Sequence, residues 1–389
     1  MSLSVGPWPT DTRLEPYSEA TGFSRWSFTS VSSARLVHQL EVRSGARQLS
    51  ILALSGGGAD GAFGAGALVG AARAGARTQF TVVTGVSAGA LLAPFAFLGP
   101  AWYPEMARIF TGGVTRGLVQ SRGLAGLFGS SLYRGEPLRH LIARYVNKAM
   151  IAAIAAQARK GRLLLVATTD LSSGEPVIWD LGSIALHGGK NAKPLIRSVL
   201  LASASVPGMF PPVVVRFRSH GVTHAETEVD GGVTLPFFIA PAPKDLPRSV
   251  RAGAQPTIVH VIINGMLRGV PRPTRDNAIS VFQRCLSVAL NFRTQTLLQA
   301  TADTLRRRGI TFEYAAISAS YPLRGAFDFT PQAQRSLFQY AAHCAAARRL
   351  WIGRSAGTGA AMDSTFPVVT TPRCPPGGAT FEEFAALHQ

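Results

Sequence analysis

Cysteine is scarce in this sequence, and long hydrophobic runs are missing. Of 389 residues, 3 are cysteines, and no Cys-x-x-Cys pair or His/Cys cluster occurs. This excludes a disulfide-rich scaffold and gives no sign of a zinc site. A single disulfide between Cys344 and Cys374 stays open. No window reaches the roughly 18 apolar residues that a membrane span requires, because Pro94 interrupts the most apolar stretch, residues 88–97.

Acidic residues are also few. The chain has 21 Asp and Glu against 39 Lys and Arg, which gives a formal net charge of +18, and only five of the basic residues are lysines. Such a charge attracts anionic partners, either a phospholipid surface or a nucleic acid. No basic stretch is interleaved with aromatic residues, so we expect no nucleic-acid partner. Peripheral contact with an anionic membrane stays open, beside a simple role of the charge in solubility.

The composition, 47% hydrophobic and 15% charged, is that of a globular protein. Residues 1–46 have no sustained periodicity, and we expect an N-terminal extension packed on a main domain of residues 47–353. Residues 354–389 form a tail rich in Gly, Thr and Pro. The N-terminus lacks the basic head and apolar run of a secretory signal. This fits a cytoplasmic protein, or a periplasmic or secreted one whose signal has been removed.

Short apolar runs alternate with helical patterns along the main domain. A turn at Ser173-Gly174 indicates a hairpin. The pattern of residues 276–308 places Ile279, Phe282, Leu286 and Leu290 on one helical face. The alternation predicts a layered α/β domain with a largely parallel sheet. The expected strands are residues 49–54, 80–84, 163–169, 177–179, 257–263 and 312–317, and the expected helices are residues 62–74, 88–98, 138–145, 195–203, 276–308 and 336–351.

A glycine-rich turn, Gly56-Gly57-Gly58-Ala59-Asp60-Gly61, follows the first of these strands and precedes a helix. Backbone N–H groups at such a turn can hold a phosphate or a reaction's oxyanion. The spacing also satisfies the dinucleotide fingerprint, which expects an acidic residue about 20 positions later. Residues 61–104 contain no Asp or Glu, which argues against a nicotinamide cofactor. No Gly-Lys-Ser/Thr follows, which excludes a phosphate-binding P-loop.

A second motif, Gly85-Val86-Ser87-Ala88-Gly89, also lies between a strand and an apolar helix. It has the G-x-S-x-G pattern of a nucleophile elbow, in which a sharp turn exposes the serine hydroxyl at the carboxyl end of a strand. Ser87 is therefore the candidate nucleophile.

Ser87 requires a base, because a free hydroxyl is a weak nucleophile at neutral pH. His260 follows Asp230 in the sequence, so a Ser-Asp-His triad is available. His260 lies within a strand-like run, however, where a histidine is more often a core residue. Asp230 itself is the alternative base, because the two glycines that follow it allow a tight turn and leave its carboxylate uncovered.

Four blocks of the sequence, taken in order, resemble those of the patatin-like phospholipases. The resemblance covers residues 48–352. The blocks are Gly56-Gly57-Gly58-Ala59-Asp60-Gly61, Gly85-Val86-Ser87-Ala88-Gly89, Ala202-Ser203-Ala204-Ser205-Val206-Pro207-Gly208-Met209-Phe210-Pro211-Pro212 and Asp230-Gly231-Gly232.

The resemblance implies a three-layer α/β/α sandwich with a mostly parallel central sheet, and a Ser-Asp dyad that acts on lipid acyl esters. Ser87 is then the nucleophile and Asp230 the base. The oxyanion hole is Gly56, Gly57 and Gly58, where the amides of Gly57 and Gly58 donate and Gly56 shapes the turn. Asp60 stands where the family often has Arg or Lys. Its negative charge weakens the field of the loop and leaves the backbone donors unchanged.

We therefore expect a serine lipid acyl hydrolase that works through an acyl-enzyme and requires no cofactor. The alternatives are a catalytically inactive lipid-binding or scaffold protein of the same fold and, less favoured, a dinucleotide-dependent enzyme.

Overall fold

The computed structural model describes residues 25–27 and 49–354, with gaps at 77–78, 114–116, 119, 121–122, 124–129, 220–221, 247–256, 268–273, 275 and 324. Most of the predicted N-terminal extension and all but the first residue of the tail lie outside these residues. Cys374 lies outside them too, so its pairing with Cys344 stays a prediction, as do the domain limits.

Within the described residues, ten strands form one mixed sheet. Its centre consists of five parallel strands in the order β4-β3-β2-β8-β9. Every residue of β2, β3 and β4 is buried, as expected for parallel strands that are covered on both faces. The central strands are β2 Ser50–Leu54, β3 Val82–Val86, β4 Leu163–Asp170, β8 Ile258–Met266 and β9 Thr311–Ile317.

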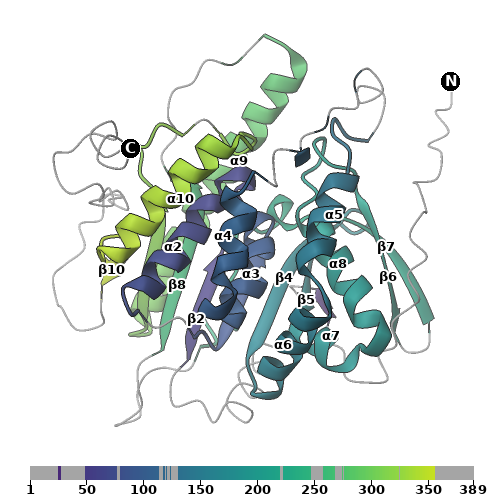
Figure 1. Cartoon of the computed structure of the whole chain (residues 1–389), viewed down its shortest axis with the longest axis horizontal. Helices are drawn as coiled ribbons and strands as arrows, with labels where there is room; N and C mark the ends of the chain where they lie inside the picture. Colours follow the sequence, from purple (N-terminus) through teal and green to yellow (C-terminus); the bar gives the residue numbers. More distant parts are fainter. Residues whose placement is uncertain are drawn as a thin grey trace.

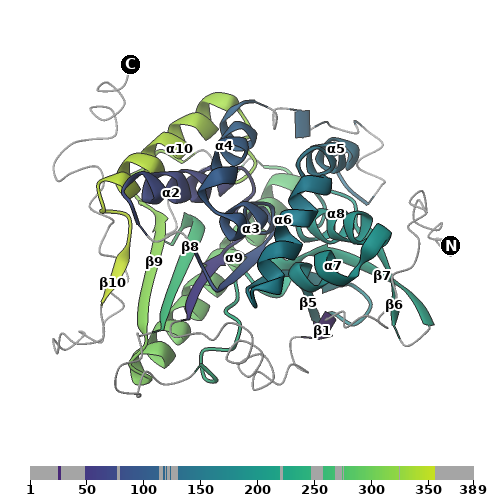
Figure 2. The ribbon, with the colours of Figure 1, turned by 60° about the horizontal axis from the view of Figure 1, so that its bottom comes forward.

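Antiparallel strands extend the sheet at both ends (Figure 2). Strand β10 (Ile352–Arg354) pairs with β9 at one end. At the other end, β5 (Pro176–Asp180) pairs with β4, and β1 (Arg25–Ser27) pairs with β5. A hairpin of β6 (Val213–Ser219) and β7 (Val222–Asp230) joins the last residues of β4 through β7. This hairpin was not predicted, and it carries Asp230 at its end.

Helices cover both faces of the sheet, so the predicted α/β/α sandwich is confirmed. Figure 1 looks onto one helical layer, in which α2, α3, α4 and α10 lie in front of the strands. Leu52 and Leu54 of β2 point into this layer, whereas Ile51 and Ala53 pack on the opposite face with residues of α9. The helices are α2 Gly61–Arg73, α3 Ala88–Leu98, α4 Tyr103–Thr111, α5 Glu136–Tyr145, α6 Lys148–Arg159, α7 Leu181–His187, α8 Ala192–Ser203, α9 Ala278–Arg307 and α10 Pro331–Ala346.

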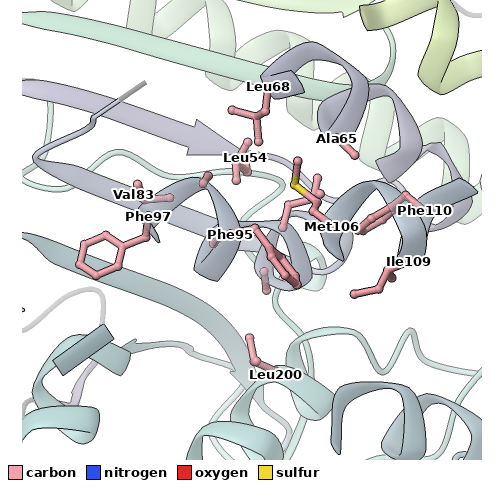
Figure 3. Close-up of a cluster of buried hydrophobic side chains, with 14 of the residues drawn as sticks. Leu54, Ala65, Leu68, Val83, Phe95, Phe97, Met106, Ile109, Phe110 and Leu200 are labelled. Atoms are coloured by element: carbon pink, nitrogen blue, oxygen red, sulfur yellow. The ribbon is translucent and has the colours of Figure 1, made fainter. Parts of the chain in front are cut away.

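The core of the first layer gathers side chains from several helices around the end of β2. Figure 3 shows Leu54 of β2 with Leu68 of α2, Phe95 of α3 and Met106 of α4. This apolar packing fixes the starts of α2 and α3 relative to the sheet. Both glycine motifs of the sequence lie at these two helix starts.

Helix α10 differs most from its predicted span. Residues 336–351 were expected to be helical, but α10 begins at Pro331 and ends at Ala346. Proline suits the first turn of a helix, where its missing N–H has no intrahelical partner. The residues that follow turn back, and Ile352–Arg354 form the edge strand β10.

Helix α2 packs closely on α10 through glycines. A Cβ atom at Gly66 would lie 2.1 Å from the carbonyl oxygen of Phe338, and one at Gly70 would lie 2.1 Å from that of Ala342. The backbones of α2 and α10 could not lie this close together if a side chain stood between them. The small residues of α2 are therefore a packing requirement.

We predict that Gly66→Ala and Gly70→Ala each lower the free energy of unfolding by about 1 to 3 kcal/mol, the usual effect of overpacking. Helix propensity alone predicts the opposite sign, because alanine is favoured over glycine by about 1 kcal/mol. Urea unfolding measures the difference. Gly265→Ala is the control, since a Cβ there has no atom within 4 Å. A gain in stability in either α2 variant would contradict the close packing.

Candidate active site

The predicted nucleophile lies on a sharp turn between β3 and α3. Ser87 has φ 55° and ψ −123°, a conformation that costs a residue with a side chain about 1 to 3 kcal/mol. The flanking glycines make the turn possible. A Cβ at Gly85 would lie 2.5 Å from the Gly89 carbonyl oxygen, and one at Gly89 would lie 2.3 Å from that of Leu54. The local geometry is that of a nucleophile elbow.

The glycine-rich turn lies directly beside Ser87. A Cβ at Gly56 would be 3.2 Å from Ser87 Cβ and 3.8 Å from Ser87 Oγ. Gly57 must also lack a side chain, because its Cβ would lie 2.0 Å from the carbonyl oxygen of Asn264. Gly58 has φ +56°, and a Cβ there would lie 2.2 Å from the Ala326 carbonyl oxygen.

The amides of this turn differ in their hydrogen bonds. The Gly56 N–H donates to the Pro236 carbonyl, and the Ala59 N–H donates to the Ala326 carbonyl. Over the described part of the chain, the N–H groups of Gly57 and Gly58 have no protein acceptor. They are therefore available to an external anion, while the Gly56 amide is used to hold the turn.

Asp230 ends strand β7 and lies beside the elbow. Strand pairing places it opposite Thr168 of β4, and its N–H donates to the Ser205 carbonyl. Its Oδ1 accepts a hydrogen bond of 2.7 Å from the Gly232 N–H. The residue is 4% exposed. The glycines after Asp230 thus bend the chain so that a backbone amide holds one carboxylate oxygen.

Burial raises the pKa of Asp230 to about 7, and the Ser87 hydroxyl and the Gly232 amide oppose this shift. The Ser87 side chain is thus close enough to the carboxyl group to lower its pKa. No hydrogen bond of ordinary geometry joins the two side chains, however, and Asp230 Oδ2 has no partner among the described residues. Catalytic hydrogen bonds are often long in a free enzyme and tighten when substrate binds.

His260 lies apart from this pair. It is the third residue of β8, in register with Leu52, which is about 13 Å before the level of Ser87 along the strands. Its Nε2 lies 3.2 Å from Glu313 Oε2, and its ring packs edge-on against Phe80 and Trp351. The imidazole is therefore held within the sheet by Glu313 and two aromatic rings, away from Ser87.

Asp60 is buried at the start of α2. It lines a cavity of about 190 Å³ together with Tyr321, Leu323 and Asp328. Ser87 and Asp230 do not line this cavity. Burial raises the pKa of Tyr321 well above its ordinary value, and the charge of Asp60 adds to the shift.

Two residues that position the site were missed by sequence reasoning. Ser203 Oγ accepts a hydrogen bond of 3.0 Å from the Ser87 N–H and donates one of 2.7 Å to the Ala167 carbonyl. Ser203 belongs to the third block of the family resemblance, which was the available signal.

Asn264, near the end of β8, holds the glycine-rich turn. Its N–H donates to Ser55 Oγ, its Nδ2 donates to the Ser55 carbonyl, and its Oδ1 accepts from the Gly64 N–H, all at 2.8 to 3.0 Å. The side chain thus joins the entry to the turn with the first turn of α2. The only sequence signal is a polar residue at the end of an apolar strand.

Residues 52–242 match the family model described as patatin-like phospholipase. This segment is a patatin-like phospholipase domain. It contains the elbow, the glycine-rich turn and Asp230, whereas Asn264 and α9 lie beyond the matched residues. The family supports lipid acyl hydrolase activity in general and implies lipid substrates.

Among solved structures, the chain is similar to VipD from Legionella pneumophila, with 12% sequence identity and a TM-score of 0.37 over 80% of this chain and 68% of that one. The search of curated proteins found no match.

In the residues that the structure describes, no helix is long and apolar enough to cross a bilayer. No group of His, Cys, Asp and Glu side chains in these residues could hold a metal ion.

The raised pKa of Asp230 predicts a pH-dependent cost to stability. Between about pH 4 and pH 7 the folded protein keeps a proton that the unfolded chain releases, so the contribution of this group to stability falls as the pH rises through that range. At pH 8 we expect the free energy of unfolding of Asp230→Asn, measured with urea, to exceed that of the wild type by roughly 4 kcal/mol if the whole difference in pKa is expressed. Near pH 4 this difference should disappear. The exposed Asp276 supplies the control, Asp276→Asn. Equal stabilities of Asp230→Asn and wild type at pH 8 would argue against a buried, costly carboxylate.

Proposed function

We propose that this protein is a serine acyl hydrolase of lipid esters in which Ser87 is the nucleophile and Asp230 the base. The observation that carries the proposal is the convergence of three features at one point. A serine in an elbow conformation lies beside a buried carboxyl group with a pKa near neutrality and beside two backbone amides that have no acceptor among the described residues.

The reaction begins with proton transfer. The Asp230 carboxylate accepts the Ser87 proton through Oδ2 as Ser87 Oγ attacks the ester carbonyl. A general base works best when its pKa lies near the working pH, and burial has brought Asp230 to that value. The same burial makes proton acceptance favourable, because it disfavours the charged carboxylate.

The tetrahedral oxyanion then binds the amides of Gly57 and Gly58. The positive end of α3, which begins at Ala88, adds to the stabilisation of negative charge. Collapse of this intermediate expels the alcohol, which takes the proton from Asp230, and leaves the acyl group on Ser87. Water that is deprotonated by Asp230 hydrolyses the acyl-enzyme and releases the fatty acid.

The catalytic domain is proposed to comprise residues 47–353, with residues 1–46 as an extension and 354–389 as a tail. The class of ester, whether phospholipid, lysophospholipid or neutral ester, is tested by mass spectrometry of the products formed from a mixed lipid extract. A catalytically inactive lipid-binding protein is the second candidate. A fluorophosphonate separates the two, because only an activated Ser87 reacts with it.

The base is tested by comparing two variants on a short-chain nitrophenyl ester. We expect Asp230→Asn to lose nearly all activity, since an amide cannot accept the proton, and His260→Gln to keep it, since His260 bonds Glu313. A triad would make the histidine variant at least as harmful. Ser87→Ala is the inactive reference and should fold normally, because it removes one oxygen. Collapse of kcat/KM in correctly folded His260→Gln would overturn the dyad.

The pKa of Asp230 also predicts the pH profile. We expect kcat/KM to rise with pH, with an apparent pKa near 7, and to level off above it, because the base must be ionised to accept a proton. Stopped assays between about pH 5 and pH 9 measure the profile, and Ser87→Ala corrects for background hydrolysis. A profile that is flat across pH 7 would exclude a base with this pKa.

A further inference from the structure

The long helix α9 has two halves with opposite character. In the second half, Thr294, Leu298, Thr301 and Leu305 are buried at helical spacing. No residue of 280–293 is buried, although this half is rich in apolar side chains. In Figure 1 the first half, in light green, extends above the helical layer at the top of the view.

Most of the exposed large hydrophobic side chains lie on this first half. Five such side chains are exposed in the described residues, and all but Leu171 belong to α9: Val281, Phe282, Val288 and Phe292. Phe292 is 65% exposed and Phe282 54%. Val281, Val288 and Phe292 recur at the spacing of one helical stripe. Val281 precedes the buried Thr294 by about three and a half turns, so the stripe faces away from the core.

The charge on this half of α9 has one sign. No acidic residue occurs between Asp276 and Asp303, while Arg284 and Arg293 lie on the helix, and residues 268–275 before it contain three further arginines. An apolar helical face flanked by arginine is typical of helices that lie in the interface of an anionic bilayer. The formal net charge of +18 favours the same surface.

This half of the helix is joined to the candidate active site. The Arg293 guanidinium donates to the carbonyls of Val233 and Thr234, which follow the Asp230-Gly231-Gly232 turn. Gln283 Nε2 lies 3.1 Å from the sulfur of Met209. Met209 follows Ser205, whose carbonyl accepts the Asp230 N–H. The half of α9 that carries the exposed stripe therefore contacts the segments that hold the proposed base.

We propose that the first half of α9 docks on anionic membrane surfaces and brings the lipid esters to Ser87. The inference rests on the proposed function for its purpose. Its test does not require catalysis, because docking can be measured with Ser87→Ala protein, which leaves the vesicles intact.

The experiment measures sedimentation of full-length Ser87→Ala protein with vesicles of equal parts phosphatidylcholine and phosphatidylglycerol. We expect the added double substitution Phe282→Ser and Phe292→Ser to weaken binding at least about tenfold, since it removes the two largest exposed apolar side chains of this half of α9. Binding should also weaken with salt and with pure phosphatidylcholine, because salt screens the positive charge of the protein and phosphatidylcholine carries no net charge. Leu171→Ser, which removes the exposed leucine outside α9, is the matched control and should bind as the parent does.

Hydrolysis of a soluble short-chain ester, measured with Ser87 intact, should be unchanged by the double substitution. If neither the wild type nor the double variant hydrolyses this ester, the proposed function is contradicted. The docking proposal is then still decided by the vesicle measurement alone. Equal vesicle binding by the double variant and the Leu171 control overturns the docking proposal. So does a change from dimer to monomer in the double variant without loss of vesicle binding, because the stripe would then be a contact between copies. If the double variant fails to fold, Val288→Asp alone should weaken binding to the anionic vesicles.

Discussion

The backbone conformation of Ser87 is the constraint on which the candidate site depends. A residue with a side chain adopts this φ and ψ only where its surroundings hold it, and here the hydrogen bond from the Ser87 N–H to Ser203 Oγ does so. Ser203 in turn donates to the carbonyl of Ala167 on β4. The elbow is therefore tied to the neighbouring strand, and the glycines at 85 and 89 clear the space for the turn.

The parallel centre of the sheet determines which segments meet at the elbow. Strands β2, β3 and β8 end at the same edge, so the glycine-rich turn, Ser87 and Asn264 arrive together from distant parts of the chain. Asn264 then makes three hydrogen bonds to the turn and to α2. Backbone amides that must point at a developing charge gain from such support, because donors already in place need no reorganisation during the reaction.

Burial of Asp230 serves the proposed chemistry at a cost to stability. The apolar surroundings raise the pKa of its carboxyl group toward neutrality, which suits a base. The same surroundings destabilise the fold wherever the carboxylate is ionised. A single amide, that of Gly232, holds one oxygen and leaves the other without a protein partner among the described residues. Hydrogen bonds to both oxygens would lower the pKa of Asp230 and make it a weaker base for the proposed reaction.

The sequence by itself determined the local features of the backbone, namely the central strands and the turns that follow them. Apolar runs and glycine punctuation predicted the central strands, the elbow and the glycine-rich turn, because backbone sterics act over a few residues. The hairpin of β6 and β7, the roles of Ser203 and Asn264, and the exposed stripe of α9 were not predicted. Asp230 and His260 were both available to Ser87 in the sequence, and only the packing of β7 against β4 brings Asp230 beside it and leaves His260 with Glu313. Contact and burial between residues more than a hundred positions apart depend on how the strands pair, and no local pattern in the chain contains that information.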